Sequence, residues 1–285
     1  MVFFNSKNEV DKRIDVRDNV VRDFLGEGAG GKTFKIYSRE LKKERVLKVI
    51  NPSDVNPKES ALMAKLEGAN LENIVQVYDA GYNIAKSVEL TTRLEDPKEM
   101  YAIIMEYVNG EKLTDVIKSG LTEEKVLKYS AQIYNGIKSL REHGIFHRDL
   151  RPDNIMVVKD YVVKKNWDEN IAKKDVVKII DFGIATDEPE AEPKDNRRYG
   201  GYNDFFSLGM ITYKMATNKH LIKTREDDSD TQNYANTIKE LKKEAFDESG
   251  LKEEYKEKIR VNVSKKVGDI ILGCFEEKSP VNNLE

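Results

Sequence analysis

Hydrophobic and polar residues alternate over short stretches in the first third of the chain. In residues 33–38, Phe34, Ile36 and Ser38 occupy every second position, and a period of two is typical of a strand with one buried face. Alternating or short apolar runs predict further strands over residues 20–25, 45–50, 74–80 and 100–107. The segment before about residue 107 is therefore expected to be rich in β-structure.

The spacing of apolar residues changes to three and four in other parts of the chain, which is typical of helices. Glu59, Met63 and Leu66 fall on one face of a short predicted helix. Thr122 is a predicted N-cap, and the apolar positions after it continue at helical spacing until Gly144. The chain after residue 107 is therefore expected to be mainly helical.

Two later segments predict helices with different surroundings. Residues 204–217 are apolar on nearly every side, which predicts a helix in the interior of a lobe. A second pattern predicts a surface helix whose apolar side is formed by Tyr234, Ile238, Leu241 and Ala245. Together these elements predict an α+β protein with an N-terminal extension at 1–19, a β-rich lobe at 20–107 and a helical lobe at 108–285.

The composition argues against several classes of protein. Of the 285 residues, 39% are hydrophobic and 35% are charged, and no apolar run approaches the ~18 residues of a membrane span. The formal charge of −3 comes from 48 basic and 51 acidic residues that are interspersed, so a nucleic-acid partner is not expected. The first residues lack the pattern of a secretory signal and Cys274 is the only cysteine, which favours a cytoplasmic location.

The stretch LGEGAGGKTFK at residues 25–35 fits two phosphate-binding patterns. From Gly26 to Thr33 it reads G-x-x-x-x-G-K-[ST], the loop of P-loop nucleotidases, and from Gly26 to Gly31 it reads G-x-G-x-x-G. A P-loop is followed at once by a helix, whereas a predicted strand begins at Thr33. The apolar run that ends in Asp181 is also found in P-loop enzymes, but the hairpin around the loop favours the second pattern.

Three further motifs follow the glycine-rich loop in a fixed order. They are VLKVI around Lys48, HRDLRPDN from His147 to Asn154, and DFG from Asp181. With the loop, they resemble the eukaryotic-type protein kinase family over about residues 20–280. The resemblance implies a bilobal kinase fold with a β-rich N-lobe and a mainly helical C-lobe, and no strand-helix-strand unit supports a dinucleotide-binding fold instead.

The resemblance implies a site for ATP and Mg²⁺, with Mn²⁺ as a possible substitute. Gly26, Gly28 and Gly31 would let the hairpin backbone close over the phosphates. Lys48 would pair with the α- and β-phosphates, and Glu59 on the first helix would hold it. Without the resemblance, Lys48 would be read as a solvated charge and Glu59 as an exposed carboxylate at the start of a helix.

The second and third motifs supply the implied catalytic and metal-binding groups. Asp149 would accept or orient the proton of the substrate hydroxyl, and Arg151 would keep a positive charge near the transferred phosphate. Asn154 and Asp181 would bind the metal ion. His147 is expected to pack in the core, because two other histidines and one cysteine in the chain do not make a zinc site.

The residues of the implied adenine site are assigned from their position relative to the other motifs. Backbone groups of Glu106 and Val108 would bond adenine in the hinge between the lobes, with Met105 behind it. The predicted nucleotide-binding residues also include Leu25, Thr33, Val46 and Met156. Thr33 and Val46 stand where the family usually has Val and Ala, so the pocket is expected to differ somewhat.

The chain departs from the family pattern in three places. Arg151 replaces a lysine, an insert at residues 159–175 contains the only tryptophan, Trp167, and no Ala-Pro-Glu motif occurs between Asp181 and Asp204. The insert either docks a partner or extends a hairpin, and the second is the simpler interpretation. The Arg148 side chain would either receive a phosphorylated activation segment or form a salt bridge to acids in residues 187–195. The missing motif leaves the mode of peptide binding open.

These residues favour a serine/threonine protein kinase that acts on a protein substrate and also phosphorylates itself. Two alternatives remain. A small-molecule kinase on the same fold would explain the missing Ala-Pro-Glu motif, although Arg148 argues against it. A pseudokinase that serves as a binding module would be expected to lack Lys48, Asp149 or Asp181, and all three are present.

Overall fold

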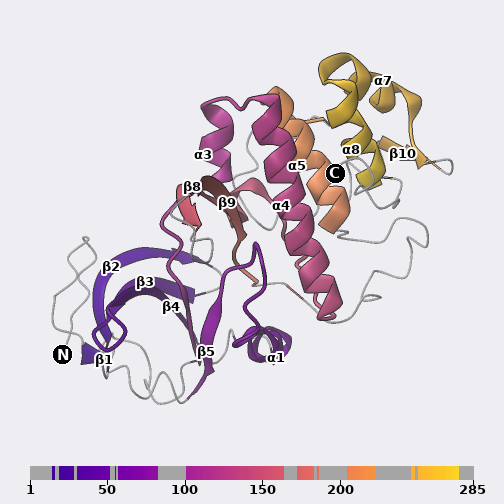
Figure 1. The fold of residues 1–285 in the computed structure, drawn as a ribbon. Helices are drawn as coiled ribbons and strands as arrows, with labels where there is room; N and C mark the ends of the chain where they lie inside the picture. The colour runs from indigo at the N-terminus through magenta and orange to yellow at the C-terminus, as the bar shows by residue number, and fades with distance from the viewer. Residues whose placement is uncertain are drawn as a thin grey trace. The chain divides into compact units, whose positions relative to one another are not determined.

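The computed structural model describes residues 15–16, 19–28, 31–51, 55, 57–82, 101–163, 172–182, 185, 204–221, 245–247 and 250–275. The chain divides into two compact units (Figure 1). The first comprises residues 1–109 with 182–187, and the second comprises residues 110–181 with 188–285. Strands predominate in the first unit and helices in the second, which confirms the predicted α+β class.

The first unit is built on an antiparallel sheet of six strands in the order β1-β2-β3-β4-β6-β5. The strands are β1 (Asp15–Val16), β2 (Asn19–Gly28), β3 (Gly31–Ser38), β4 (Lys43–Ile50), β5 (Val77–Gly81) and β6 (Tyr101–Glu106). The predicted strands are all present, but β5 begins three residues later than predicted. Asn73, just before the predicted start, has a φ of +59°, which interrupts the extended backbone.

The alternation in β3 does place one face in the core. Phe34, Ile36 and Ser38 are buried, and the residues between them are only partly buried. Leu62 and Met63 of α1 (Pro57–Leu66) are also buried, and α1 packs beside β5 (Figure 1). The sheet therefore has a helix-covered apolar core, which fixes the register of the strands that carry the predicted phosphate site.

The glycine-rich loop joins two paired strands. Gly28 of β2 lies opposite Gly31 of β3, so the segment is a hairpin and the P-loop interpretation is wrong. Gly31 has a φ of +102°, and a Cβ atom there would lie 2.2 Å from the carbonyl oxygen of Val49. Only glycine fits this position, because the neighbouring strand leaves no room for a side chain.

The second unit is mainly helical. It contains α3 (Leu113–Lys118), α4 (Glu123–Glu142), α5 (Asp204–Thr217), α7 (Glu253–Asn262) and α8 (Lys265–Phe275). The Thr122 hydroxyl accepts the Lys125 N–H at 3.4 Å, and Gly144 with a φ of +67° follows the helix end. Both predicted ends of α4 are therefore confirmed.

The helix α5 runs through the interior of the second unit, as its apolar sequence predicts. It packs against α4 and α8 (Figure 1). At Gly209 an added Cβ would lie 2.8 Å from the ring of Phe275, so glycine permits the close approach of α5 and α8. Cys274 of α8 is 1% exposed, and burial raises the pKa of its thiol to about 12. It is a core residue and not a reactive thiol.

A small sheet lies beside α4 and consists of β7 (Glu111–Lys112), β8 (Ile155–Val163) and β9 (Ala172–Ile179). Pairing between β8 and β9 continues from Ile155 to Val163, so the described part of the insert extends a hairpin. Trp167 lies outside the described residues. The short pair β10 (Phe246–Asp247) and β11 (Gly250–Leu251) completes the strands of this unit.

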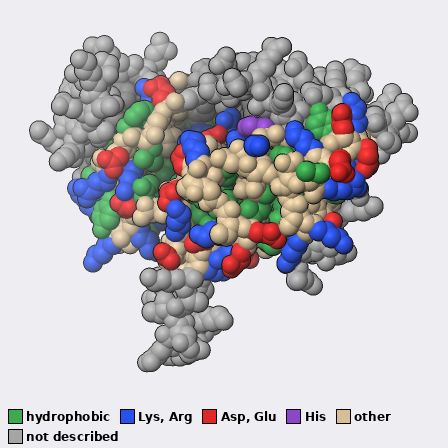
Figure 2. All heavy atoms as spheres, turned by 90° about the horizontal axis from the view of Figure 1, so that it is seen from above, with side chains coloured by type: hydrophobic (Ala, Val, Ile, Leu, Met, Phe, Trp, Pro, Cys, Tyr) green, Lys and Arg blue, Asp and Glu red, His purple; other side chains and the backbone are tan. Residues whose placement is uncertain are grey.

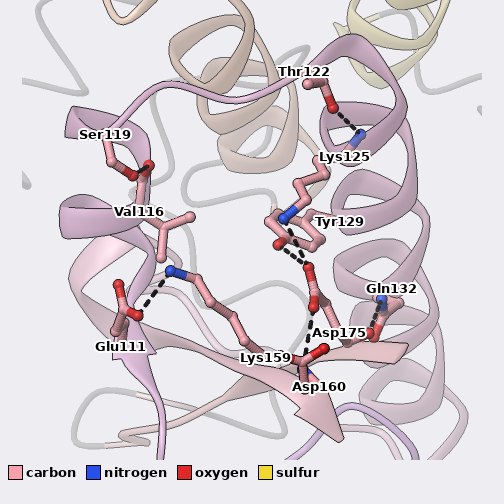
Figure 3. Close-up of polar contacts among 10 residues, drawn as sticks. All are labelled: Glu111, Val116, Ser119, Thr122, Lys125, Tyr129, Gln132, Lys159, Asp160 and Asp175. Carbon is pink, nitrogen blue, oxygen red and sulfur yellow. Dashed lines mark hydrogen bonds and ion pairs between the residues drawn. The ribbon is translucent and has the colours of Figure 1, made fainter. Parts of the chain in front are cut away.

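Asp175 fastens the extended hairpin to α4 (Figure 3). Its carboxylate accepts the Tyr129 hydroxyl at 2.6 Å and lies 3.3 Å from the ammonium of Lys125. Although burial alone would raise the pKa of Asp175, these two partners lower it below the ordinary value. Gln132 adds two bonds, to the Asp175 carbonyl oxygen and from the Val177 N–H. The described part of the hairpin is therefore a fixed part of the second unit.

The surface seen in Figure 2 carries charges of both signs. Lys and Arg side chains lie interspersed with Asp and Glu side chains on this face, as the sequence predicts. Within the described part of the chain, no helix is both long enough and apolar enough to span a bilayer. Of the predicted surface helix, Tyr234, Ile238 and Leu241 lie outside the described residues, whereas Ala245 is described and buried.

We predict that a buried hydroxyl pair joining α4 to α5 contributes strongly to stability. The Ser130 and Thr212 oxygens are 2.9 Å apart, and both side chains are fully buried. Ser130→Ala or Thr212→Val should each lower the free energy of unfolding by about 1–3 kcal/mol, because each leaves a buried hydroxyl without its partner. The double variant should lose less than the sum of the two. Urea unfolding of all four proteins gives the coupling energy, and simple additivity would contradict the prediction.

Candidate active site

A buried carboxylate on α5 holds the loop that follows α4. Asp204 is 1% exposed, and its two oxygens accept the backbone N–H groups of His147 and Arg148 at 3.0 and 2.9 Å. Arg148 has a φ of +65°, which is uncommon for a residue with a side chain. Hydrogen bonds to a carboxylate are strong, so Asp204 stabilises this turn of the loop in an otherwise costly conformation.

The His147 ring joins the loop to the end of β9. The side chain is fully buried, with Nε2 at 3.1 Å from the Ile180 carbonyl oxygen and Nδ1 at 3.3 Å from the Asp149 backbone nitrogen. A carbonyl oxygen can only accept, so Nε2 carries the proton and Nδ1 accepts the Asp149 N–H. The prediction that His147 packs in the core is confirmed.

The Asn154 side chain spans the loop and contacts Asp149. Its Nδ2 donates to the main-chain oxygen of Asp149 at 2.9 Å and to Oδ2 at 2.8 Å. These two contacts fix the orientation of the amide, so Oδ1 faces away from Asp149. The Asn154 carbonyl oxygen also accepts the Ile180 N–H at 2.9 Å. Asp149, Asn154 and the residue before Asp181 therefore belong to one hydrogen-bonded network.

Asp149 lies partly buried, and its surroundings change its acidity. Burial raises the pKa of the carboxyl above its ordinary value, and the nearby charge of Asp181 acts in the same direction. His147, Arg151 and the hydrogen bond from Asn154 act the other way without cancelling the effect of burial. A carboxylate with a raised pKa is a better base than an exposed one, which suits a group that takes or orients a proton.

Arg151 is held by Asp153 in the described structure. Its Nε and one terminal nitrogen donate to Asp153 Oδ2 at 3.2 and 2.8 Å, and Thr114 of α3 donates to Oδ1 at 2.9 Å. Burial alone would raise the pKa of Asp153, but these hydrogen bonds lower it below the ordinary value. Arg151 still acts electrostatically on Asp149. The predicted positive charge is therefore present beside the candidate base.

The donors near Asp149 fit a divalent metal ion. Asp181 follows β9 with an exposed side chain and a φ of +63°, close enough to Asp149 for their charges to interact. Oδ1 of Asn154 and the Asp181 carboxylate are hard oxygen ligands, and Mg²⁺ commonly takes one or two protein ligands together with substrate phosphates. Among the described residues, no three His, Cys, Asp or Glu side chains form a complete metal site. The donor set therefore suits an ion that a phosphate ligand shares.

The predicted phosphate-binding residues of the first unit lie on neighbouring strands. Lys48 is in the middle of β4, opposite Thr33 of β3 and Ile103 of β6, and is partly buried. Gly26 of β2 lies opposite Thr33, whereas Leu25 beside it is 46% exposed. Val46 lies two residues before Lys48 on the same strand. Glu59 lies in α1, and its side chain is outside the described residues.

The hinge prediction concerns backbone groups at the end of β6. The Glu106 N–H donates to the Gln76 carbonyl oxygen at 2.8 Å, and Gln76 N–H donates back to the Glu106 side chain at 3.1 Å. The Glu106 N–H is thus already used within the sheet. A contact to adenine is left to the Glu106 carbonyl oxygen and to the backbone of Val108, and this assignment stays a prediction.

The two units each bring together part of the predicted site. The second unit gathers Asp149, Arg151, Asn154 and Asp181, and Met156 lies nearby on β8. Sequence reasoning missed two positioning residues, Asp204 and Asp153. Asp204 could have been suspected, because a carboxylate that opens an otherwise apolar helix is costly to bury without partners. No pattern in the sequence indicates the pairing of Asp153 with Thr114.

Comparison with known proteins decides the family. The family pattern described as the protein kinase domain matches residues 20–280. This chain belongs to the protein kinase family. The kinase match and the fold confirm the bilobal α+β class that the motifs predict. Residues 186–203, where the Ala-Pro-Glu motif would be expected, lie outside the described residues.

Similar proteins include kinases from animals and bacteria. The chain is 28% identical to myosin light chain kinase 3 of Mus musculus over 254 residues, which covers 79% of this chain and 29% of the mouse protein. It is 28% identical over 228 residues to serine/threonine-protein kinase A of Synechocystis, covering 68% of this chain and 39% of that kinase. The protein kinase chain thus spans less than half the length of these curated relatives.

A solved structure supports the same fold. The crystal structure of Rad53 residues 1–466 in complex with AMP-PNP superposes with a TM-score of 0.58 at 22% sequence identity. The match covers 94% of this chain and 62% of the Rad53 chain. At this identity the similarity shows the kinase fold alone.

We predict that the loop of this kinase loses stability when the Asp204 carboxylate is replaced. In Asp204→Asn, one acceptor oxygen becomes an NH₂ group that faces a backbone N–H, so one of the two bonds is lost and a buried donor is left unsatisfied. The free energy of unfolding should fall by about 2–4 kcal/mol, as measured by urea unfolding.

Asp269→Asn is a matched control, because the Asp269 side chain on α8 is only partly buried and forms no hydrogen bond or ion pair within the described part of the chain. A loss of under about 0.5 kcal/mol in Asp204→Asn, the range of a plain surface substitution, would contradict the role given to Asp204.

Proposed function

We propose that this protein is a serine/threonine protein kinase that transfers the γ-phosphoryl group of ATP to a hydroxyl of a protein substrate and to its own chain. The observation that carries the proposal is the network in which Asp149, Asn154 and the backbone before Asp181 are held together by Asp204 and His147. Phosphoryl transfer depends mainly on positioning and charge, and this network positions each group with short hydrogen bonds.

Asp149 is the group that orients the acceptor hydroxyl. Burial raises the pKa of Asp149, and a more basic carboxylate is a better acceptor for the hydrogen bond of the hydroxyl. The Asn154 amide holds one carboxylate oxygen, Oδ2, at 2.8 Å. The other oxygen, Oδ1, therefore points to the acceptor, and Arg151 supplies positive charge beside it.

Asn154 and Asp181 would hold the metal ion, which is Mg²⁺ in this proposal with Mn²⁺ as a possible substitute. When bound there, the ion would supply positive charge that offsets the charge of the phosphates. Asn154 can ligate only through Oδ1, since Nδ2 is used on Asp149. One amide oxygen and one carboxylate are a sparse donor set, and it is completed by phosphate oxygens and water.

Lys48 and the β2–β3 hairpin bind the phosphates of ATP, and Glu59 holds Lys48 from α1. Lys48 lies in the middle of β4, a strand that is paired on both sides, so a rigid backbone carries its charge. The nucleotide-binding residues are Leu25, Gly26, Gly28, Gly31, Thr33, Val46, Lys48, Glu106, Val108 and Met156. The AMP-PNP complex of Rad53 supports an ATP site by analogy of fold.

We also propose the acceptor residue, the location and the partners of the protein. The acceptor is serine or threonine, in line with the names of relatives such as serine/threonine-protein kinase A. We place the protein in the cytoplasm, with a protein substrate and with neither nucleic acid nor a membrane as partner. The small-molecule kinase is kept as a second candidate, because the sequence between Asp181 and Asp204 has no Ala-Pro-Glu motif.

We predict that Asp149→Asn abolishes phosphoryl transfer while it stabilises the fold. Loss of the base should lower kcat by at least about 100-fold. Because burial raises the pKa of Asp149, the ionised carboxylate favours the unfolded state above that pKa. The variant should therefore unfold at a higher urea concentration than wild type at pH 7, and this difference should shrink as the pH falls toward 3.8, the ordinary value.

Intact-mass spectrometry after incubation with Mg²⁺ and ATP, with released ADP followed in the same samples, measures transfer directly. Phosphate increments on wild type and none on Asp149→Asn are the expected result, and fragmentation should find them on Ser or Thr. Increments on tyrosine alone would contradict the Ser/Thr assignment. ADP release that depends on an added metabolite, without protein modification, would favour the small-molecule kinase. Nucleotide binding without any transfer would favour the pseudokinase.

A further inference from the structure

A group of cationic side chains lies near the paired Arg151 and Asp153 in the second unit. Arg151 acts electrostatically on Asp149 and also on Lys214 of α5. Lys214 also interacts with the charges of Asp153 and Lys118. Arg151 therefore connects Asp149 with a group of cations that come from the loop after α4, from α3 and from α5.

The fold fixes the position of Lys214. It lies ten residues after Asp204 on α5, which is about 15 Å along a helix. Asp204 accepts hydrogen bonds directly from the loop that follows α4. Tyr213 and Met215, the residues on either side of Lys214, are buried in the core. Lys214 itself is only partly buried, and burial lowers the pKa of its ammonium group. A rigid core helix thus presents this charge beside the loop.

The two carboxylates of this group are each paired with another cation. Asp153 is paired with Arg151 at 2.8 Å, and Asp115 is paired with Lys118 at 2.9 Å. Lys112 of β7 also interacts with the charge of Asp153. Within the part of the chain that the structure describes, neither Lys112 nor Lys214 forms an ion pair. This cluster, which we call the Lys214 cluster (Lys112, Asp115, Lys118, Arg151, Asp153 and Lys214), has four cations and two carboxylates.

We propose that the Lys214 cluster is an anion-recognising subsite that selects peptide substrates with acidic residues next to the acceptor hydroxyl. The inference rests on the proposed protein kinase activity and adds the charge class of its substrate. A peptide whose hydroxyl reaches Asp149 brings its flanking side chains close to this cluster. A carboxylate there gains attraction from Lys214 and Lys112, whereas a Lys or Arg side chain is repelled.

The physical properties of the cluster predict how the selection appears in kinetics. Attraction at a partly exposed site acts on binding before the chemical step, so it should change KM more than kcat. It should also weaken as the salt concentration rises, because ions screen charges over about 10 Å at 0.1 M. These two features distinguish an electrostatic subsite from a change in the catalytic groups.

The test uses three peptides that differ only in the residues flanking a single serine, which are Glu, Gln or Lys. Wild-type protein with Mg²⁺ and ATP should phosphorylate the Glu peptide with a kcat/KM about tenfold or more above that of the Lys peptide, mainly through KM. This ratio should fall when the salt is raised from about 0.05 to 0.5 M.

Charge variants at Lys214 then assign the selection. Lys214→Gln should lower the Glu-to-Lys ratio about threefold or more, and Lys214→Glu should bring it to about one or below. Lys138→Glu is the matched control, because it makes the same charge change at an exposed position of α4 that does not act on Asp153 or Lys214. The Glu-to-Lys ratio of Lys138→Glu should equal that of wild type. Urea unfolding checks that each variant is folded.

The following results would overturn the proposal. A wild-type ratio of one or below would show no preference for acidic peptides. A high ratio that persists in Lys214→Gln, or that falls equally in Lys138→Glu, would show that Lys214 is not its source. Phosphorylation of all three peptides at equal rates would contradict the subsite but not the proposed kinase activity. The absence of transfer to any peptide and to the protein itself would overturn the proposed kinase activity as well.

Discussion

The two hydrogen bonds from the loop backbone to Asp204 determine how this site is built. A charged carboxylate in the interior of a lobe is costly unless it is paired and bonded. Asp204 meets that requirement by accepting the N–H groups of His147 and Arg148. One interaction therefore satisfies a buried charge and fixes the backbone that leads to Asp149.

The remaining contacts of the loop follow from this arrangement. Once the backbone at 147–148 is fixed, the His147 ring reaches Ile180, and Asn154 reaches back to Asp149. These bonds join the loop, η2 (Pro152–Asn154) and the residue after β9. Apart from the bond between Asn154 Nδ2 and Asp149 Oδ2, each of them involves a backbone group, which limits the movement of Asp149 and Asn154. Such preorganised geometry is what phosphoryl transfer requires, because no large rearrangement is then needed at the moment of reaction.

The charges around the loop divide into two sets with different tasks. Asp149, Asn154 and Asp181 face the phosphoryl group and metal ion in the proposed function. Arg151 belongs to both sets, because it acts on Asp149 and is held by Asp153. Lys214 and Lys112 add positive charge near Asp153, where the proposed subsite would attract an acidic side chain of the substrate. The replacement of the usual lysine by Arg151 suits this role, since a guanidinium group can bond one carboxylate through two nitrogens.

Local sequence patterns were enough to predict the class of fold, the strand that follows the glycine-rich loop, and the ends of α4. These features depend on local patterns, such as alternation in β3 and the cap at Thr122, which need no distant partner. The order of the motifs also indicated Lys48, Asp149, Asn154 and Asp181, because each type of residue has a chemical task in the kinase family. The start of β5 was missed, since the turn at Asn73 leaves no clear signal in the pattern.

The groups that support the site became evident only from the packing of distant elements. Asp204 is 57 residues from His147 in the chain, and Thr114 is 39 residues from Asp153. Neither pairing follows from spacing, because both depend on how α3 and α5 pack against the loop. The same holds for the Lys214 cluster, whose members come from three distant parts of the sequence. Local patterns are enough to form helices and strands. The partners of a buried charged group depend on how those helices and strands pack together.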